Sequence, residues 1–278
     1  MTFDAFDLHR DILGAVAHHG FETPTPIQEK AIPAILTGSD LLGLAQTGTG
    51  KTAAFVLPII HRLMKSRSKT PRALVLAPTR ELAAQINDAV RSLSKGTGLR
   101  SAVVYGGVGM SPQTEALGRG VDILVACPGR LLDHLSRKNV DFSKLETLVI
   151  DEADRMFDMG FLPDIRRIAR HLPGKRQTLL FSATMPADIR GLADDMLRDA
   201  VTVQIGHTKP IDTVSHALYP VEHHLKTALL RELLAATDTD SVLVFTRTKH
   251  RAERLAHQLS HAGFRAVSLQ GNLSQSRR

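Results

Sequence analysis

The sequence predicts an α/β fold in which a mostly parallel β-sheet carries helices on both faces. Short apolar runs alternate with segments of helical periodicity along the chain, and this alternation is typical of parallel sheets. The 278 residues, 43% of them hydrophobic, can bury a full core. Glycine or proline stands at most breaks between the runs, namely Gly38, Pro71, Gly106, Gly107, Pro128 and Pro173.

Each strand is predicted by a short, nearly continuous apolar run. Between them lie helical segments, of which TRELAAQINDAVRSLSK at 79–95 is the most regular. Parallel strands need such crossover connections. The expected strands of the first part of the chain are 40–46, 72–78, 99–105, 122–127, 145–151 and 177–183.

A polar stretch, QIGHTKPIDT at 204–213, interrupts this rhythm and is typical of a linker between domains. We therefore expect one domain at 1–205, a linker at 206–213 and an incomplete second domain at 214–278. The second domain has about three strands, fewer than a typical sheet. Its expected strands are 214–219, 241–246 and 265–269, and its expected helices are 222–236 and 248–262.

Composition narrows the classes of protein. The single cysteine, Cys127, excludes an internal disulfide framework, and no apolar run approaches bilayer length. The N-terminal MTFDAFDLHR is unlike a signal peptide, so we expect a cytoplasmic protein with no membrane partner. The net charge of +7 and pI near 9.8 favour a polyanionic partner such as nucleic acid, although a basic surface also serves solubility alone. The thirteen histidines show no zinc-ligand spacing and are expected to be solvated.

The most informative local motif is AQTGTGKT at 45–52, between a predicted strand and a predicted helix. In such a loop backbone N–H groups face a phosphate, Lys51 reaches the terminal phosphates, and the Thr52 hydroxyl ligates Mg²⁺. Ala45 departs from the general pattern, which begins with glycine. The alternative is a glycine and threonine loop that merely joins a strand to a helix.

Three acids, Asp151, Glu152 and Asp154, follow the strand that ends in VID at 149–151. Carboxylates at that place either cap a helix N-terminus or serve a nucleotide site. Since a phosphate loop needs an acid at the end of a nearby strand, the second interpretation is favoured. Asp151 would then hold Mg²⁺ through water, and Glu152 would orient an attacking water molecule.

Seven motifs occur together in an order that closely resembles the DEAD-box ATP-dependent RNA helicases, with the bacterial RhlE-like branch as the nearest. The resemblance covers essentially the whole chain and continues into the second domain with LVFTRTK and LQGNLSQSRR. It implies a RecA-like first domain and a chain truncated within a second RecA-like domain. The motifs are GFETPTPIQ (20–28), AQTGTGKT (45–52), PTRELAAQ (78–85), YGG (105–107), CPGR (127–130), DEAD (151–154) and SAT (182–184).

The resemblance implies a site for Mg²⁺ and ATP. Gln28 would pair with the adenine edge, Phe21 would stack on the ring, and Phe3 would support that pocket. The alternatives are an exposed helical glutamine for Gln28 and an anchored apolar terminus for Phe3. The remaining implied residues are Lys51, Asp151 and Glu152 for catalysis, Thr52 and Asp151 for the metal, and Gln46, Thr47, Gly48, Thr49, Gly50, Lys51 and Thr52 for the phosphates.

The resemblance also implies an RNA face, formed by Thr79, Arg80, Gly107 and Arg130. Arg130 is expected to face outward. The alternatives are a capped helix with Arg80 in an ion pair, and an ordinary turn at the paired glycines. The family usually has threonine where this chain has Cys127, so a hydroxyl contact there is not expected.

A third implied function is coupling of the two sites. The hydroxyls of Ser182 and Thr184 would bond Asp154 or its neighbours, although an ordinary turn at a strand end satisfies the same residues. The whole then resembles an RNA-stimulated ATPase that contacts RNA mainly through the backbone, opens short duplexes locally and serves RNA processing or ribosome assembly.

The family's arginine fingers follow the element seen here as Gln275 to Arg278, so we expect ATP binding by this chain without useful turnover. Two rival functions stay open. One is another P-loop enzyme, such as a nucleotide kinase or DNA translocase, and the other is a nucleotide- and RNA-binding module without turnover.

Overall fold

The computed structural model describes residues 1–66, 68–206, 215–274 and 277–278. The chain divides into two compact units, Met1–His207 and Thr208–Arg278.

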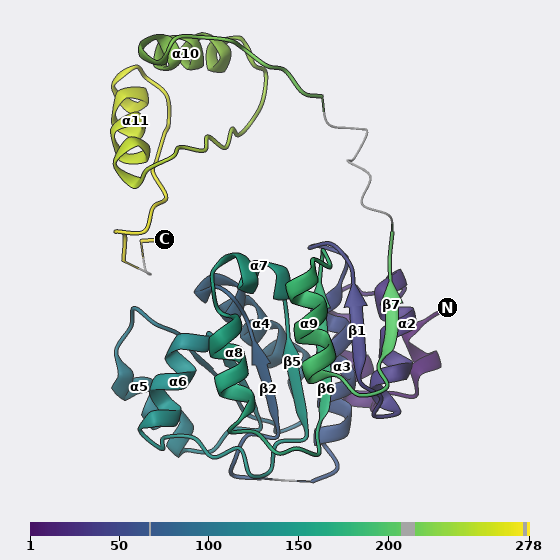
Figure 1. Ribbon diagram of the computed structural model, residues 1–278. Coiled ribbons are helices and arrows are strands. Elements are labelled where there is room, and N and C mark those ends of the chain that lie inside the picture. Colours follow the sequence, from purple (N-terminus) through teal and green to yellow (C-terminus); the bar gives the residue numbers. More distant parts are fainter. Residues whose placement is uncertain (67, 207–214, 275–276) are drawn as a thin grey trace. The chain divides into compact units, whose positions relative to one another are not determined.

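Within the described part of the first unit, seven parallel strands form one sheet in the order β3-β4-β2-β5-β6-β1-β7 (Figure 1). This sheet confirms the predicted α/β class. All six expected strands are present, each shorter than the apolar run that predicted it. The strands are β1 Leu41–Leu44, β2 Ala73–Leu76, β3 Ser101–Val104, β4 Ile123–Ala126, β5 Thr147–Ile150, β6 Gln177–Ser182 and β7 Val201–Gln204.

The seventh strand, β7, was not predicted. It lies at the sheet edge beside β1, where only Val203 of its four residues is buried, so it lacks the apolar run of an inner strand. The Asp40 carboxylate ties this side of the sheet together by accepting hydrogen bonds from Thr178 N at 2.7 Å and Arg198 N at 2.8 Å. The backbone N–H of Val201 then donates to the Asp40 carbonyl at 2.9 Å.

Helices cover both faces of this sheet, as predicted (Figure 1). Residues of α1 to α4 pack into the core on one face, and residues of α5 to α9 pack into the core on the other. The described elements are η1 Phe3–Phe6, α1 Arg10–His18, α2 Pro26–Leu36, α3 Lys51–Leu63, α4 Arg80–Leu93, α5 Met110–Gly118, α6 Pro128–Ser136, α7 Ala153–Asp158, α8 Leu162–Ala169 and α9 Ala187–Met196.

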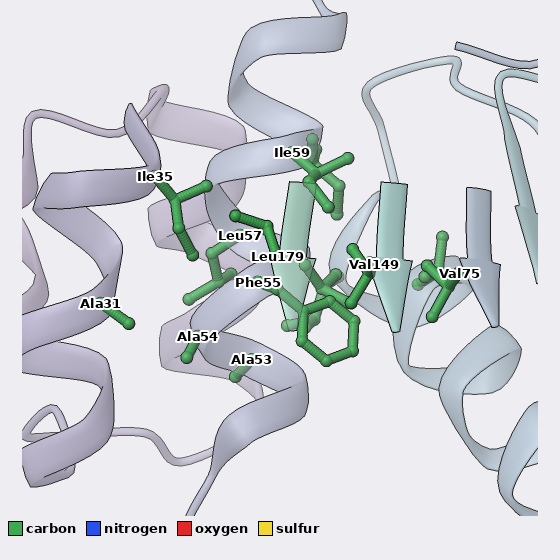
Figure 2. Close-up of a cluster of buried hydrophobic side chains, with 14 of the residues drawn as sticks. Ala31, Ile35, Ala53, Ala54, Phe55, Leu57, Ile59, Val75, Val149 and Leu179 are labelled. Carbon is green, nitrogen blue, oxygen red and sulfur yellow. The ribbon is translucent and has the colours of Figure 1, made fainter. Parts of the chain in front are cut away.

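The two cores meet across the central strands, because successive strand residues point to opposite faces. Leu179 of β6 belongs to the core under α3, and Leu180 belongs to the other core. Figure 2 shows Phe55 of α3 beside Leu179 and Val149 in the first of these cores. Since α3 is anchored in this way, the loop between β1 and α3 starts and ends at fixed points.

All carboxyl ends of parallel strands lie at one edge of a sheet. The segments that begin at the ends of β1, β2, β3, β4, β5 and β6 contain six of the seven predicted motifs, whereas GFETPTPIQ precedes β1. These six motifs therefore lie at the same edge of the sheet.

The second unit contains the expected helices as α10 Lys226–Ala236, preceded by η2 His223–Leu225, and α11 Lys249–His261. The prediction of strands in this unit is wrong. Among the described residues, none of the segments 215–219, 241–246 and 265–269 forms a strand. A strand exists only by pairing with another, and these runs stay unpaired in the described unit. Their exposed large hydrophobic side chains are Leu218, Tyr219, Val242, Leu243, Val244, Phe245, Val267 and Leu269.

The described part of this unit therefore leaves apolar surface uncovered. The predicted linker at 206–213 lies outside the described residues except for Gly206, and so does Gln275.

Candidate functional site

The loop at 45–50 joins β1 to α3 at the carboxyl edge of the sheet. Gly48 and Gly50 adopt left-handed backbone conformations, with φ of 85° and 93°, which glycine reaches without strain. The Thr49 hydroxyl closes the turn by donating to the Gln46 carbonyl at 2.8 Å. The first N–H groups of α3 have no partner within the helix, so the loop and helix start offer donors to an anion.

Lys51, the first residue of α3, is buried against this loop. Its Nζ donates to the Ala45 carbonyl at 2.9 Å, so the ammonium group lies over the loop instead of extending into solvent. A bound phosphate would offer the same ammonium group a charged acceptor, which makes a stronger hydrogen bond than a carbonyl does.

A cavity of about 510 Å³ opens beside the loop, a volume typical of small-ligand sites. The N-terminal segment and the loop both line it. The lining residues are Gly20, Phe21, Glu22, Thr23, Thr25, Gln28, Gly48, Gly50, Thr52, Ala53, Ala89 and Leu93.

Gln28 lines the cavity and is only 4% exposed, so the alternative of an exposed helical glutamine is wrong. Its Oε1 accepts from the Thr25 N–H at 2.9 Å, and its Nε2 donates to the Gly50 carbonyl at 3.1 Å. The amide keeps one further N–H and one further lone pair, enough for one donor and one acceptor toward a ligand. Thr25, which sequence reasoning missed, is the residue that orients this amide.

Phe21 lines the cavity and is 39% exposed, which leaves part of its ring available to a ligand. Phe3 stacks on it with ring centroids 6.4 Å apart and an interplanar angle of 28°. Because Phe3 is buried and also contacts Phe6 edge-on, the N-terminus holds the Phe21 ring beside the cavity.

Asp151 follows β5 and is 2% exposed. Burial raises the pKa of its carboxyl to about 6, and the nearby positive charge of Lys51 opposes this rise in pKa. The Glu152 N–H donates to Asp151 Oδ1 at 3.0 Å. A buried carboxylate that still faces a lysine is suited to a cation as its additional partner.

Glu152 is the N-cap residue of α7, but its side chain makes no capping hydrogen bond, so the helix-cap interpretation is wrong for this side chain. Its Oε1 instead accepts from the Thr47 hydroxyl at 3.3 Å, and its Oε2 lies 3.4 Å from Arg155 Nη1. Its backbone has φ of 53°, an uncommon value for a residue other than glycine. The acid pair and the glycine loop are therefore in direct contact.

Asp154 contacts the segment that follows β6, the strand between β1 and β5 in the sheet. Its Oδ2 accepts hydrogen bonds from the Thr184 hydroxyl at 3.1 Å and from Thr184 N at 3.0 Å. The Ser182 hydroxyl accepts from Asp154 N at 3.2 Å and donates to the Thr184 carbonyl at 2.7 Å. The structure therefore brings together the three residues expected to couple the two sites.

Two arginines flank the loop at 106–108 after β3. The Arg80 guanidinium lies so close over Gly107 that a Cβ on residue 107 would be 1.9 Å from Arg80 Nη1 and would displace it. Gly107 also has φ of 80°, a backbone conformation that is strained for residues with a side chain. Both Nη atoms of Arg130 donate to the Val108 carbonyl at 3.1 Å.

The expectation that Arg130 faces outward is wrong, since its side chain is 12% exposed and its Nε lies 3.6 Å from Asp133. The expectation was based on the CPGR motif at a helix start, and this local pattern contains no information about the Val108 carbonyl, which lies 22 positions away in the sequence. Thr79 caps α4, accepting from Leu82 N at 3.3 Å. Thr79, Arg80, Gly107 and Arg130 nevertheless gather at the ends of neighbouring strands β2, β3 and β4.

Cys127, at the start of α6, is buried, and burial raises the pKa of its thiol to about 11. The thiol is therefore protonated at neutral pH and offers no nucleophile. Among the described residues no group of three or more His, Cys, Asp and Glu side chains is arranged to hold a metal by itself. Mg²⁺ commonly takes one or two protein ligands and completes its shell with phosphate and water.

A parallel α/β sheet, a glycine-rich phosphate loop and buried acids at the same edge define a P-loop nucleotide-binding protein. The family model for DEAD/DEAH box helicases matches residues 25–192. The chain belongs to this family.

The chain is 41% identical over 275 residues to the DEAD-box ATP-dependent RNA helicase RhpA of Helicobacter pylori, covering 99% of this chain and 56% of that protein. It is 42% identical over 278 residues to the ATP-dependent RNA helicase CshA of Listeria monocytogenes, covering 99% and 53%. A DEAD box protein of the hyperthermophile Methanococcus jannaschii has a similar structure, with a TM-score of 0.71, 36% identity and coverage of 100% of this chain and 75% of that one.

The chain thus spans about half the length of the curated relatives it matches. No helix in the described part of the chain is long and apolar enough to cross a membrane.

Proposed function

We propose that this chain is the ATP-binding and RNA-binding part of an ATP-dependent RNA helicase that opens short duplexes locally. The observation that carries the proposal is the contact of Thr47 in the phosphate loop with Glu152 in the acid pair, beside a cavity of nucleotide size. Family membership supports the same function.

The residues present fit Mg²⁺ and ATP. The N–H groups of the loop from Gln46 to Gly50 and the Lys51 ammonium would hold the phosphates, while Thr52 would ligate Mg²⁺ and Asp151 would hold it through water. When bound, Mg²⁺ neutralises charge that develops on the phosphate oxygens. The Glu152 carboxylate orients the attacking water molecule and accepts a proton from it.

The adenine lies in the cavity between the Phe21 ring and the Gln28 amide. Gln28 uses the one donor and one acceptor that its contacts with Thr25 and Gly50 leave over. At the edge that carries N7, adenine presents the N6 donor beside the N7 acceptor, whereas guanine presents the O6 and N7 acceptors. An amide with one donor and one acceptor to spare therefore favours ATP over GTP.

Single-stranded RNA lies across Thr79, Arg80, Gly107 and Arg130 through its phosphates, which gives little sequence preference. The bonds of Asp154 with Ser182 and Thr184 transmit a change in the acid pair to this face. From the resemblance of its motifs we also propose that the protein is cytoplasmic and nearest to the RhlE-like branch. Its proposed partners act in RNA processing or ribosome assembly.

In this proposal residues 1–205 form the ATP-binding domain, 206–213 the linker, and 214–278 part of a second domain. Calorimetry of the 278-residue chain with Mg²⁺ tests the function. The chain should bind ATP at least tenfold more tightly than GTP, about the difference in affinity that one good base contact produces. A ten-nucleotide RNA should bind more tightly than the matching DNA. Equal affinity for the two nucleotides together with a preference for DNA would indicate another kind of P-loop enzyme.

A further inference from the structure

The loop at 105–109 has two features that would leave it without a fixed shape. It follows β3, which lies at the sheet edge and pairs only with β4 among the described residues, so no strand pairs with the outer side of Tyr105. It also contains three glycines, which have many conformations to lose. Both of these features are compensated by one side chain.

That side chain is Gln113 of α5, which is only 7% exposed. Its Oε1 accepts a hydrogen bond from Tyr105 N at 3.2 Å, and its Nε2 donates to the Tyr105 carbonyl at 3.2 Å. The same Nε2 donates to the Gly109 carbonyl at 3.1 Å. The amide therefore pairs both backbone groups of Tyr105, as a neighbouring strand would, and fixes the two ends of the loop relative to each other.

The loop held in this way lies between two cationic side chains. Arg80 packs over Gly107 from α4, and Arg130 donates from α6 to the Val108 carbonyl. The position of the loop backbone therefore determines where both guanidinium groups lie. The Gln113 side chain carries no charge, and its hydrogen bonds in the described structure are with Tyr105 and Gly109.

We propose that Gln113 is a positioning residue for RNA binding, because it holds the loop at 105–109 in the shape that sets Arg80 and Arg130 toward an RNA backbone. The inference rests on the proposed function of this face. A merely structural glutamine at a sheet edge would instead affect stability without a selective effect on RNA.

Three variants separate these roles. Gln113→Met keeps the length of the side chain and removes all its hydrogen bonds. Gln113→Glu keeps the acceptor for Tyr105 N and removes the donors to the two carbonyls. Ser111→Ala is the control, since Ser111 is exposed on the same helix. Each 278-residue variant is titrated into a fluorescein-labelled ten-nucleotide oligouridylate, and ATP affinity, thermal midpoint and hydrogen exchange at 105–109 are measured alongside.

Gln113→Met should lower RNA affinity about tenfold, the effect of losing roughly one net hydrogen bond of positioning. The Tyr105 amide should exchange faster, while ATP affinity stays within twofold of the unmodified chain, a change smaller than one hydrogen bond produces. Gln113→Glu should weaken RNA binding as well, and Ser111→Ala should change none of these quantities.

Unchanged RNA affinity in Gln113→Met, with faster exchange at Tyr105, would overturn the positioning role and leave a structural one. Unchanged exchange would show that the amide does not hold the loop at all. If the unmodified chain itself fails to bind the oligouridylate, the RNA part of the proposed function fails and this inference fails with it.

Discussion

The side-chain amide of Gln28 donates a hydrogen bond to the Gly50 carbonyl at 3.1 Å, across 22 positions of the sequence. Gly50 is the N-cap residue of α3 and closes the phosphate loop. The N-terminal segment and the phosphate loop are therefore joined by a direct contact, and a change in one should affect the other.

Gln28→Ala should weaken ATP binding and also lower the free energy of unfolding by about 1 to 3 kcal/mol, because it removes two hydrogen bonds of a buried side chain. If Gln28 were exposed, as in the alternative interpretation, its replacement would leave the free energy of unfolding unchanged. Urea denaturation measures the effect, with Lys30→Ala on the exposed face of α2 as the control. Equal midpoints for Gln28→Ala and the unmodified chain would contradict it.

Gly50→Ala should disturb the same junction from the other side. A Cβ there would lie 2.6 Å from Gln28 Nε2 and 2.9 Å from Thr25 Oγ1, and φ is 93°. The strained backbone alone should cost about 1 to 2 kcal/mol, and displacement of Gln28 should weaken ATP binding. Thermal unfolding and ATP titration test this prediction.

Gly14→Ala serves as the control for Gly50→Ala, since Gly14 lies inside α1 with open space around its Cα. Alanine should stabilise that helix by up to about 1 kcal/mol. A Gly50→Ala chain as stable as the unmodified one, with full ATP affinity, would show that the junction is unimportant.

Asp151 should make the stability of the ligand-free chain depend on pH. The folded chain keeps this carboxyl protonated up to about pH 6, whereas the unfolded chain loses the proton near the ordinary pKa. The folded state therefore binds more protons between these values, and stability falls as pH rises through this interval, by roughly 3 kcal/mol from this group. Above about pH 6 this contribution is constant.

Asp151→Asn should remove that pH dependence and leave the chain at least as stable as the unmodified one at pH 7, while Mg²⁺-dependent ATP binding is lost. Urea denaturation from pH 4 to 8 and calorimetry with and without Mg²⁺ are the measurements. A simple loss of about 1 kcal/mol of stability, with Mg²⁺ dependence retained, would make Asp151 only a helix-start residue.

Glu152→Gln should keep ATP affinity and remove whatever hydrolysis the chain supports, because the proposed role of Glu152 is confined to the chemical step. Phosphate release in the presence of RNA measures hydrolysis. Glu232→Gln, at an exposed position of α10, is the control. Hydrolysis at the unmodified rate in Glu152→Gln would remove this residue from the reaction.

Arg80→Ala and Arg130→Ala should each weaken single-stranded RNA binding and reduce the slope of log affinity against log salt by about one, as expected for one lost phosphate contact. Arg170→Ala is the control. Arg170 is exposed and follows the C-terminal end of α8, so it lies at the opposite edge of the sheet. Salt slopes that stay the same in both variants would assign the two arginines to structural roles.

The sequence by itself determined the parallel α/β fold, the phosphate loop and the acid pair. Strands buried on both faces appear as continuous apolar runs, and AQTGTGKT and DEAD each lie within a few consecutive residues, so local chemistry was enough to find them. The edge strand β7 was not predicted from the sequence, because only one of its four residues is buried and it therefore has no continuous apolar run.

Only the tertiary structure decided the contacts between residues far apart in the chain. The Gln28 amide bonds the Gly50 carbonyl, the Arg130 guanidinium bonds the Val108 carbonyl, and the role proposed for Gln113 depends on its bonds with Tyr105 beyond the edge strand β3. The apolar run at 241–246 shows the same limit, since it forms no strand in the described unit. Pairing and burial need a partner in space, and no stretch of sequence contains its partner's position.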